Sequence, residues 1–571
     1  MKKHYYLIGI CLLLVLNGIA QNRVKLEYLS QDNFNHIRGE DLNLSPGDTI
    51  VIPTGSYAGI RFYDIVGLPG MPITITNEGG QVILTEELYS ALEFYRSSYV
   101  HVTGSGSDDV KYGFRIESLY SHSQGINLTN FTSDVEIDFV HVAKAGFAGI
   151  MAKTDPSCGY PETFRSSGFV MKNINIHHNK IRNVGGEGVY IGHTGSSITS
   201  SFISCDGIPV FGHWLENVSV NNNRISSTGR DAIQLNLVRF GGVISNNRIT
   251  SYAKEGEYFQ DFAMSIGGGE YQIFNNSILN KAGQNGKGIQ FLNGFSGSKI
   301  FNNVLVNPRL YGIFIHNRVA FDQNEGYLIA NNTIINPELA GIRYNTVITQ
   351  STEQSKIGTT QDLTPTFFVN NVIVDPGNNF EDSNTWKGNE ESFIDFNDKS
   401  TRDAILPFIN NNLFSRDIES IGFKNIQKNN FRPNDYQSLL VDEGTNLSDS
   451  SIDFDFRNEK RISGEAIDIG AFELKLSSLR EKALNRLEVK SELETAITVF
   501  PNPATSYFSV NNTFKDMGLL QLFNEQGLRV LHIKNYLMGS TVDISGLKSG
   551  TYYLNIRYVD KSRDFGKLVV N

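Results

Sequence analysis

Four charged side chains occupy matching places in successive repeats of this sequence, each just before a short phrase of alternating apolar residues. The alternation predicts strands with one face in a core and the other face in water. Corresponding positions on neighbouring strands of a sheet lie about 4.8 Å apart. We therefore expect a ladder of reactive groups, formed by Glu187, Asp231, Lys287 and, in an ambiguous register, Asp261.

Paired carboxyl groups at these distances favour glycoside hydrolysis. A retaining glycosidase places its two carboxyl groups about 5–5.5 Å apart, and an inverting one places them about 6.5–9.5 Å apart. Glu187 and Asp231 would be one strand apart, and Asp261 would be two strands from Glu187. Repulsion within a stacked acidic pair would also raise one pKa and prepare that group to act as an acid. The predicted catalytic residues are Glu187, Asp231, Asp261 and Lys287.

Polar residues on and just beyond the same strands are the predicted sugar ligands. Amide, phenol and cationic side chains can hold the hydroxyl groups of a sugar. Trp214, at the end of a long insertion that starts at Gly192, could pack its ring against the apolar face of a pyranose. The predicted substrate-binding residues are Tyr190, Gln234, Asn236, Gln290, His316, Arg318 and Trp214.

Two other functions remain open. A polysaccharide lyase or epimerase would neutralise a uronate carboxylate with Ca²⁺ or Arg and would remove the C5 proton with a base. The residues that could serve such an enzyme are Lys287, His316, Arg318 and Tyr190. The third function is non-catalytic binding of a glycan or a surface. No cofactor is predicted with certainty, because no group of Cys and His has the spacing of a zinc site and Ca²⁺ enters only with the lyase.

The element that positions these groups is a repeat of 24 to 29 residues that is marked by the pair Asn-Asn. This period fits one rung of a solenoid. Asn tolerates the left-handed conformation of a tight corner, and its amide can bond to the same amide one rung away. We expect a column of stacked side chains formed by Asn179, Asn223, Asn247, Asn276, Asn303 and Asn332.

This pattern resembles the right-handed parallel β-helix of the pectate-lyase-like superfamily over about residues 40–415. The resemblance implies an all-β solenoid, and irregular closing turns extend the expected domain over residues 21–473. The calcium-binding carboxylates of pectate lyases and the catalytic set of polygalacturonases have no clear match in this sequence. The resemblance therefore assigns no catalytic role to any residue.

Two cysteines lie in long insertions of neighbouring rungs, at 154–167 and 192–214. An exported protein with an even number of cysteines in adjacent loops favours a disulfide. We predict a bond between Cys158 and Cys205.

The N-terminus predicts export. Lys2 and Lys3 precede an apolar run, and small residues follow it before Gln21, as is typical of a signal peptide over residues 1–20. The charged stretch 474–495 is interpreted as a linker.

The C-terminus predicts a second domain over residues 496–571, where short strands alternate with Gly and Asn turns, as in a small β-sandwich. The phrases Val499-Phe500-Pro501-Asn502-Pro503 and Gly550-Thr551-Tyr552-Tyr553-Leu554 resemble those of the type IX secretion sorting domain. The resemblance implies handling by the type IX secretion machinery, removal of this domain, and a protein that is secreted or held at the cell surface.

The charge of the chain bears on its partners. A net charge of −10 argues against nucleic acid, which would require a basic face. We expect a monomer whose partner is a polysaccharide substrate.

Overall fold

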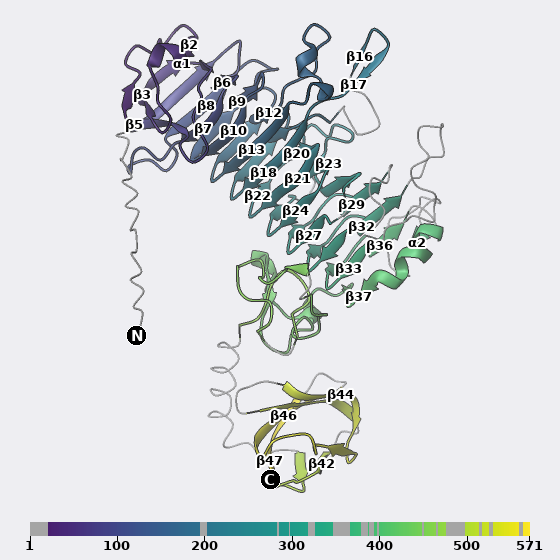
Figure 1. The fold of residues 1–571 in the computed structure, drawn as a ribbon. Coiled ribbons are helices and arrows are strands. Elements are labelled where there is room, and N and C mark those ends of the chain that lie inside the picture. The colour runs from purple at the N-terminus through teal and green to yellow at the C-terminus, as the bar shows by residue number, and fades with distance from the viewer. Residues whose placement is uncertain are drawn as a thin grey trace, which may run out of the picture.

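The computed structural model describes residues 21–194, 203–281, 285–295, 297–317, 326–346, 366–377, 386–387, 393–396, 399–447, 450–463, 466–475, 497–512, 517–524, 529–558 and 563–571. The predicted signal peptide and nearly all of the predicted linker lie outside these residues. Over the described part of the chain, a long stack of parallel strands is followed by a small unit of antiparallel strands (Figure 1). No helix among the described residues is long and apolar enough to cross a membrane.

One side of the stack is a sheet that has 13 strands within the described residues, all parallel except β35. Its strands are β2 (Asn35–Arg38), β4 (Ile60–Tyr63), β6 (Leu92–Tyr95), β9 (Ile126–Thr129), β12 (Ile150–Ala152), β15 (Val189–Ile191), β20 (Ile233–Asn236), β23 (Phe262–Gly267), β26 (Lys287–Leu292), β29 (Tyr311–Asn317), β32 (Ala340–Thr346), β36 (Ile394–Phe396) and β35 (Trp386–Lys387).

The other two sides belong to one sheet that has 23 strands in the described part of the chain. Its first flank contains β1 (Arg23–Lys25), β3 (Thr49–Ala58), β5 (Ile73–Glu86), β7 (Ser98–Thr103), β10 (Ser133–Asp138), β13 (Val170–His177), β18 (Trp214–Asn221), β21 (Val238–Ser245), β24 (Tyr271–Phe274), β27 (Lys299–Phe301), β30 (Leu328–Ala330), β33 (Phe367–Val369) and β37 (Ile409–Asn410). Its second flank contains β8 (Phe114–Ser118), β11 (Val140–Lys144), β14 (Lys180–Val184), β19 (Arg224–Thr228), β22 (Arg248–Thr250), β25 (Ser277–Leu279), β28 (Val304–Val306), β31 (Thr333–Ile335), β34 (Val372–Val374) and β38 (Leu413–Ser415). The long strand β5 pairs with both β7 and β8 and so joins the two flanks.

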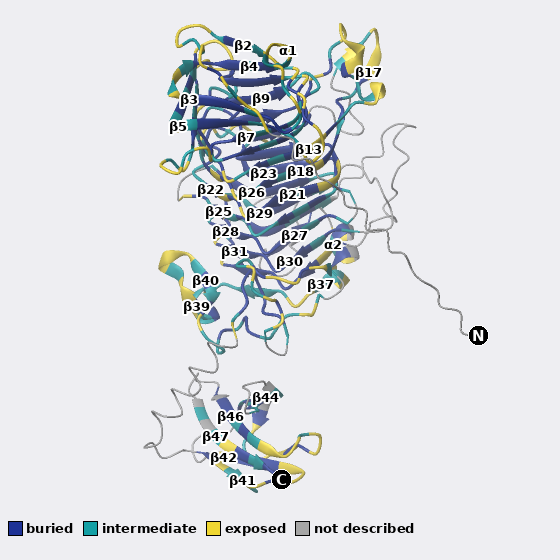
Figure 2. Cartoon of the chain, turned by 60° about the vertical axis from the view of Figure 1, so that its left-hand side comes forward, coloured by how far each residue is buried: buried dark blue, intermediate teal, exposed yellow. Residues whose placement is uncertain are grey.

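Each rung visits the 13-stranded sheet, the first flank and the second flank in turn, so the fold is the predicted parallel β-helix. Inward-facing aliphatic side chains stack in register, as Val189 does on Ile233 and Ile233 on Met264. They form one continuous core along the solenoid, and Figure 2 shows this buried interior. Because apolar neighbours repeat at every rung, burial and backbone pairing reinforce each other along the stack.

The predicted Asn column is confirmed, and it continues through Asn371 and Asn412. The backbone N–H of Asn247 donates to Oδ1 of Asn276 at 3.0 Å, and the N–H of Asn276 donates to Oδ1 of Asn303 at 3.0 Å. The left-handed conformation falls on the residue before each ladder Asn, as at Asn275 with φ 55°. The two members of each Asn-Asn pair thus have different roles: the first adopts the left-handed conformation of the corner, and the second bonds to the next rung.

Short helices, 3-10 turns and a hairpin lie between the regular strands of the solenoid. They are α1 (Gly39–Leu42), α2 (Lys399–Ile405), the 3-10 turns η1 (Pro161–Thr163), η2 (Arg165–Ser167) and η3 (Leu406–Phe408), and the hairpin of β16 (Ile203–Cys205) and β17 (Ile208–Val210). Residues 416–475, which we call the closing segment, contain η4 (Glu419–Ile421), β39 (Phe423–Asn425), η5 (Ile426–Lys428) and β40 (Asn430–Pro433). Buried Arg461 donates to the carbonyl of Gly470 within this segment at 2.8 Å, and it joins the segment to the solenoid because it also donates to the side chain of Asn302.

The C-terminal unit has a core of its own. One sheet contains β41 (Ile497–Phe500), β42 (Tyr507–Asn512) and β45 (Thr541–Asp543). The other contains β43 (Met517–Phe523), β44 (Arg529–Leu537), β46 (Gly550–Tyr558) and β47 (Arg563–Val570). This agrees with the predicted small β-sandwich.

Candidate functional site

The predicted sugar ligands in the middle of the strands do line up on the 13-stranded sheet. Tyr190 pairs with Gln234, and Gln234 pairs with Ser265, which pairs with Gln290. The Ser265 hydroxyl donates to Oε1 of Gln290 at 2.9 Å. A row of phenol, amide and hydroxyl groups therefore runs along this sheet, as the repeat predicts.

Glu187 and Asp231 occupy matching places, each two residues before a paired core residue. Both side chains are enclosed, with Glu187 1% exposed and Asp231 0% exposed. One oxygen of Asp231 accepts the N–H of Phe262 at 2.8 Å, and the other has no hydrogen-bond partner among the described residues. Burial, with a smaller effect from neighbouring acids, raises the pKa of Asp231 well above its usual value. Burial also raises the pKa of Glu187, although Arg230 lies 3.9 Å away.

This environment favours a structural role for the two acids over the predicted hydrolytic pair. A glycosidase needs at least one carboxylate that stays ionised and reaches the sugar. Asp231 is instead a buried acid that holds the start of β23 through Phe262. The stacking was predicted correctly, but the solvated edge that hydrolysis would need is absent at both residues.

The register of Asp261, which the sequence left ambiguous, is one residue away from that of Asp231. Phe262 takes the ladder position and pairs with Lys287. The Lys287 ammonium lies 2.9 Å and 2.8 Å from the two oxygens of Asp261, and both residues are buried. Because a carboxylate holds this ammonium, Lys287 is poorly suited to act as a base.

Asn236 ends β20, the strand that carries Gln234, but the other predicted ligands do not gather at one place. His316 lies on β29, which is four strands beyond Tyr190 along the sheet. Trp214 begins β18 on the other sheet, with the Arg165 guanidinium 4.1 Å from its ring centre. Trp214 is half-buried and packs against the solenoid core, so it does not line the row of polar residues. Arg318 lies outside the described residues.

Lys153 and Asp155, which are not among the predicted site residues, form an ion pair beside Tyr190. The Lys153 ammonium lies 4.5 Å from the centre of the Tyr190 ring and 3.2 Å from the carboxylate of Asp155. His193 Nε2 lies 2.6 Å from the same carboxylate. Burial opposes ionisation of Asp155, but the hydrogen bond from His193 and the charge of Lys153 outweigh it and lower its pKa to about 2. The available signal was the position of Lys153 directly after the apolar phrase that ends at Ala152.

The insertions that flank this group are tied together. Cys158 and Cys205 form the predicted disulfide, with their α-carbons 5.5 Å apart. At the base of the insertions, the N–H of Thr154 donates to Nε2 of His213 at 3.0 Å. Burial lowers the pKa of His213 to about 4, which keeps that ring neutral and able to accept this bond. The segment that carries Lys153 and Asp155 is therefore held by the bond to His213 at Thr154 and by the disulfide at Cys158.

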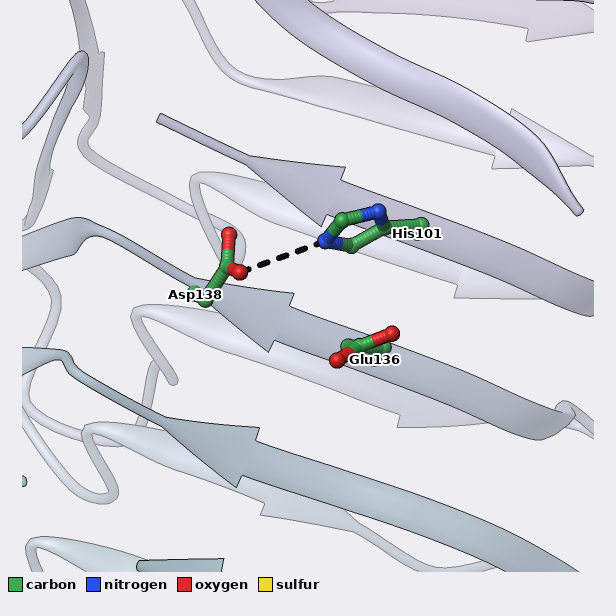
Figure 3. Close-up of side chains that lie close together, drawn as sticks. All are labelled: His101, Glu136 and Asp138. Carbon is green, nitrogen blue, oxygen red and sulfur yellow. Dashed lines mark ion pairs between the residues drawn. The ribbon is translucent and has the colours of Figure 1, made fainter. Parts of the chain in front are cut away.

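A separate cluster of His101, Glu136 and Asp138 lies on β7 and β10 of the first flank (Figure 3). His101 Nε2 lies 3.3 Å from Asp138, and His177 Nε2 lies 2.7 Å from Glu136. Calcium takes oxygen ligands, so two imidazoles do not fit the Ca²⁺ considered for a lyase. The histidines already form ion pairs with these carboxylates, and none of the predicted site residues belongs to the cluster.

Comparison with known proteins identifies the C-terminal unit. Residues 498–571 match the family described as a secretion system C-terminal sorting domain. This domain indicates type IX secretion to the cell surface or the extracellular space. No curated protein matches the sequence.

Solved structures with similar folds include three enzymes. The pectate lyase Pel9A has 14% identity and a TM-score of 0.37, covering 78% of this chain and 97% of that one. A mannuronic acid specific polysaccharide family 6 lyase from human gut microbiota has 12% identity and a TM-score of 0.31, covering 69% and 89%. The periplasmic alginate epimerase AlgG has 9% identity and a TM-score of 0.24, covering 68% and 83%. Likeness at this level carries no argument about substrate or reaction.

Proposed function

We propose that this exported protein is a polysaccharide lyase that acts on a uronate-containing glycan, with Tyr190 as the base and Lys153 as the cation beside it. The observation that carries the proposal is the contact between the Lys153 ammonium and the Tyr190 ring at 4.5 Å. The C5 proton of a uronate can be removed when the charge of its carboxylate is offset, so a cation and a base must act on the same sugar.

Lys153 can serve more than one partner. An ammonium has three donors, and Asp155 accepts one of them at 3.2 Å. The remaining donors can bind a substrate carboxylate beside the Tyr190 ring. Asp155, held in turn by His193, keeps the ammonium oriented toward Tyr190.

In the proposed reaction the deprotonated Tyr190 oxygen takes the C5 proton. The electron pair of that C–H bond forms the C4–C5 double bond, the C4–O4 bond breaks, and O4 leaves with the electrons of that bond. The Tyr190 hydroxyl then gives its proton to O4. An epimerase would start with the same proton removal but would return a proton to the other face of C5 and break no glycosidic bond.

Glycoside hydrolysis has less support, since Glu187 and Asp231 are 1% and 0% exposed, whereas Tyr190 and Lys153 each keep 8% of their surface exposed. Non-catalytic glycan binding has no specific observation in its favour and is treated as an outcome of the test.

The test is to incubate the full-length exported protein with polygalacturonate, alginate and neutral polysaccharides. Reducing ends and the ultraviolet absorbance of unsaturated uronate are followed together. A rise in both is the expected result, and it should occur only with the uronate polymers. Reducing ends without absorbance indicate a hydrolase, and a change of uronate stereochemistry without cleavage, seen by NMR, indicates an epimerase. No change with any polymer would leave only the binding function.

A further inference from the structure

The second flank of the solenoid carries a column of basic side chains on its outer face. Residues in consecutive strands pair directly: Arg115 with His141, His141 with Lys180, Lys180 with Arg224, and Arg224 with Arg248. Their neighbours along each strand, such as Ile181 and Ile225, point into the core, so these side chains point outward. We call Arg115, His141, Lys180, Arg182, Arg224 and Arg248 the basic column; Arg182 lies beside Lys180 on the same face.

The positive charges of this column are largely uncompensated within the protein. Arg115 pairs with Glu117. In the described part of the chain, no ion pair involves the side chains of Lys180, Arg182, Arg224 or Arg248. Burial, helped by Lys180 and Arg182, lowers the pKa of His141 to about 4, and burial together with neighbouring arginines lowers the pKa of Lys180. Like charges stacked about 4.8 Å apart repel each other unless an anion lies against them.

Beyond Arg248 the positions that continue the column are not basic, and from Val304 onward the closing segment covers them. Arg248 pairs with Ser277, and Ser277 pairs with Val304 in the next strand. Val304, Val306 and Val372 are buried against Phe423, Phe431 and other apolar residues of the closing segment. Figure 2 shows β22, β25, β28 and β31 in a row along this flank, with β39 and β40 near its lower end. The outer face is therefore aliphatic where it is covered and basic where it is open.

We propose that the basic column binds a linear anionic polysaccharide, one charged sugar residue for about each rung. The exposed Arg224 and Arg248 and the half-buried Lys180 and Arg182 are the contact residues. A rung spacing of about 4.8 Å is comparable to the length of one pyranose residue, so a chain lying along the solenoid meets a cation at successive rungs. The inference extends the proposed function by placing a second binding surface for the polymer outside the 13-stranded sheet.

A glycan fits this surface better than nucleic acid does. The whole chain has a net charge of −10, so the basic column is a narrow stripe on an acidic molecule. A thin single polymer can follow such a stripe, while a wider duplex would also meet the acidic surroundings. The sorting domain directs the protein to the cell surface or the extracellular space, where the polysaccharide substrate of the proposed function would lie.

The test uses the full-length protein in the Tyr190→Phe background, so that turnover does not consume the polymer. The double variant Arg224→Gln/Arg248→Gln is compared with Lys424→Gln/Lys428→Gln, which removes the same charge from exposed residues of the closing segment. Binding to polygalacturonate, dextran sulfate, neutral dextran and single-stranded DNA is measured at several salt concentrations. The first two polymers distinguish carboxylate from sulfate as the recognised anion.

We expect the column variant to bind an anionic glycan at least tenfold more weakly than its parent, and the control variant to bind within twofold of it. The slope of log Kd against log salt should also become shallower, in proportion to the lost contacts. Equal binding by the column variant and its parent, or tighter binding of single-stranded DNA than of either glycan, would overturn the inference. If the wild-type protein gives no unsaturated product from any polymer but the column variant still binds more weakly than its parent, the proposed function fails and this inference stands.

Discussion

The ammonium of Lys153 lies 4.5 Å from the centre of the Tyr190 ring, and the two residues come from adjacent rungs that pair through β12 and β15. Asp155 holds this ammonium at 3.2 Å, and His193 holds Asp155 at 2.6 Å. The chain thus presents a phenol with a fixed cation beside it on the polar row of the 13-stranded sheet. The proposed elimination depends on this pair.

Replacing Lys153 by Met should lower kcat on a uronate polymer by about 10²–10³-fold, because the carboxylate of the substrate loses the charge that stabilises the transition state. KM should change less, since polymer binding also uses other subsites. Steady-state kinetics on polygalacturonate or alginate give both values. Lys144→Met, which removes an exposed lysine from β11, is the matched control and should leave kcat unchanged.

Replacing Asp231 by Asn should change how stability depends on pH. The folded state raises the pKa of Asp231, so this group favours folding below its unfolded pKa of about 3.9, and that contribution is lost as pH rises toward the folded value. Asn keeps the oxygen that accepts the N–H of Phe262 but cannot ionise. The variant should therefore gain thermal stability relative to wild type between pH 5 and pH 8, as measured by its Tm.

Asp155 provides a control of opposite sign. Its pKa is lowered to about 2, so it stabilises the fold above its unfolded pKa of about 3.9, and this contribution is lost as pH falls toward 2. Asp155→Asn should thus be less stable than wild type at neutral pH and should approach it near pH 2. A loss of Tm at pH 8 in Asp231→Asn would contradict the raised pKa of Asp231.

Replacing Asn276 by Leu should interrupt the ladder. The N–H and side-chain amide of Asn247 would both lose Oδ1 of Asn276, and each unsatisfied buried group costs about 1–3 kcal/mol. Chemical denaturation should show a loss of about 2–5 kcal/mol in the free energy of unfolding. Ser226→Leu, on the outer face of β19, introduces the same side chain outside the ladder and should cost much less. Equal losses would mean that the ladder adds no specific stability.

The sequence was sufficient for the parts of the fold that repeat. Asn276 and Asn303 have the same neighbours one rung away, so a local phrase carries the information for a distant contact. The disulfide of Cys158 and Cys205 was also predictable, because both cysteines follow the same strand position in adjacent rungs. Which Asn of each pair turns the corner and which bonds to the next rung could not be predicted, since both residues are Asn.

The candidate site was harder to predict because it depends on how each rung departs from the repeat. The rung that contains Phe262 includes an insertion before this residue, so the number of residues from the previous repeat does not give its register. Asp261 was therefore predicted at the ladder position that Phe262 occupies. Enclosure of Glu187 and Asp231 depends on packing around the turns, which periodicity does not encode. Lys153 was overlooked because it follows its strand, and its contact with Tyr190 crosses from one rung to the next.

The most direct test of the account compares kcat of Tyr190→Phe with that of Glu187→Gln on the uronate polymer that wild type cleaves, with unsaturated uronate as the readout. Tyr311→Phe, which removes a hydroxyl four strands away on the same sheet, controls for the substitution itself. The account predicts that Tyr190→Phe loses at least about 10²-fold in kcat, as expected for a general base, while Glu187→Gln and Tyr311→Phe stay within a few-fold of wild type. Near-normal turnover in Tyr190→Phe together with inactive Glu187→Gln would contradict it and would return the chemistry to the buried carboxyl groups.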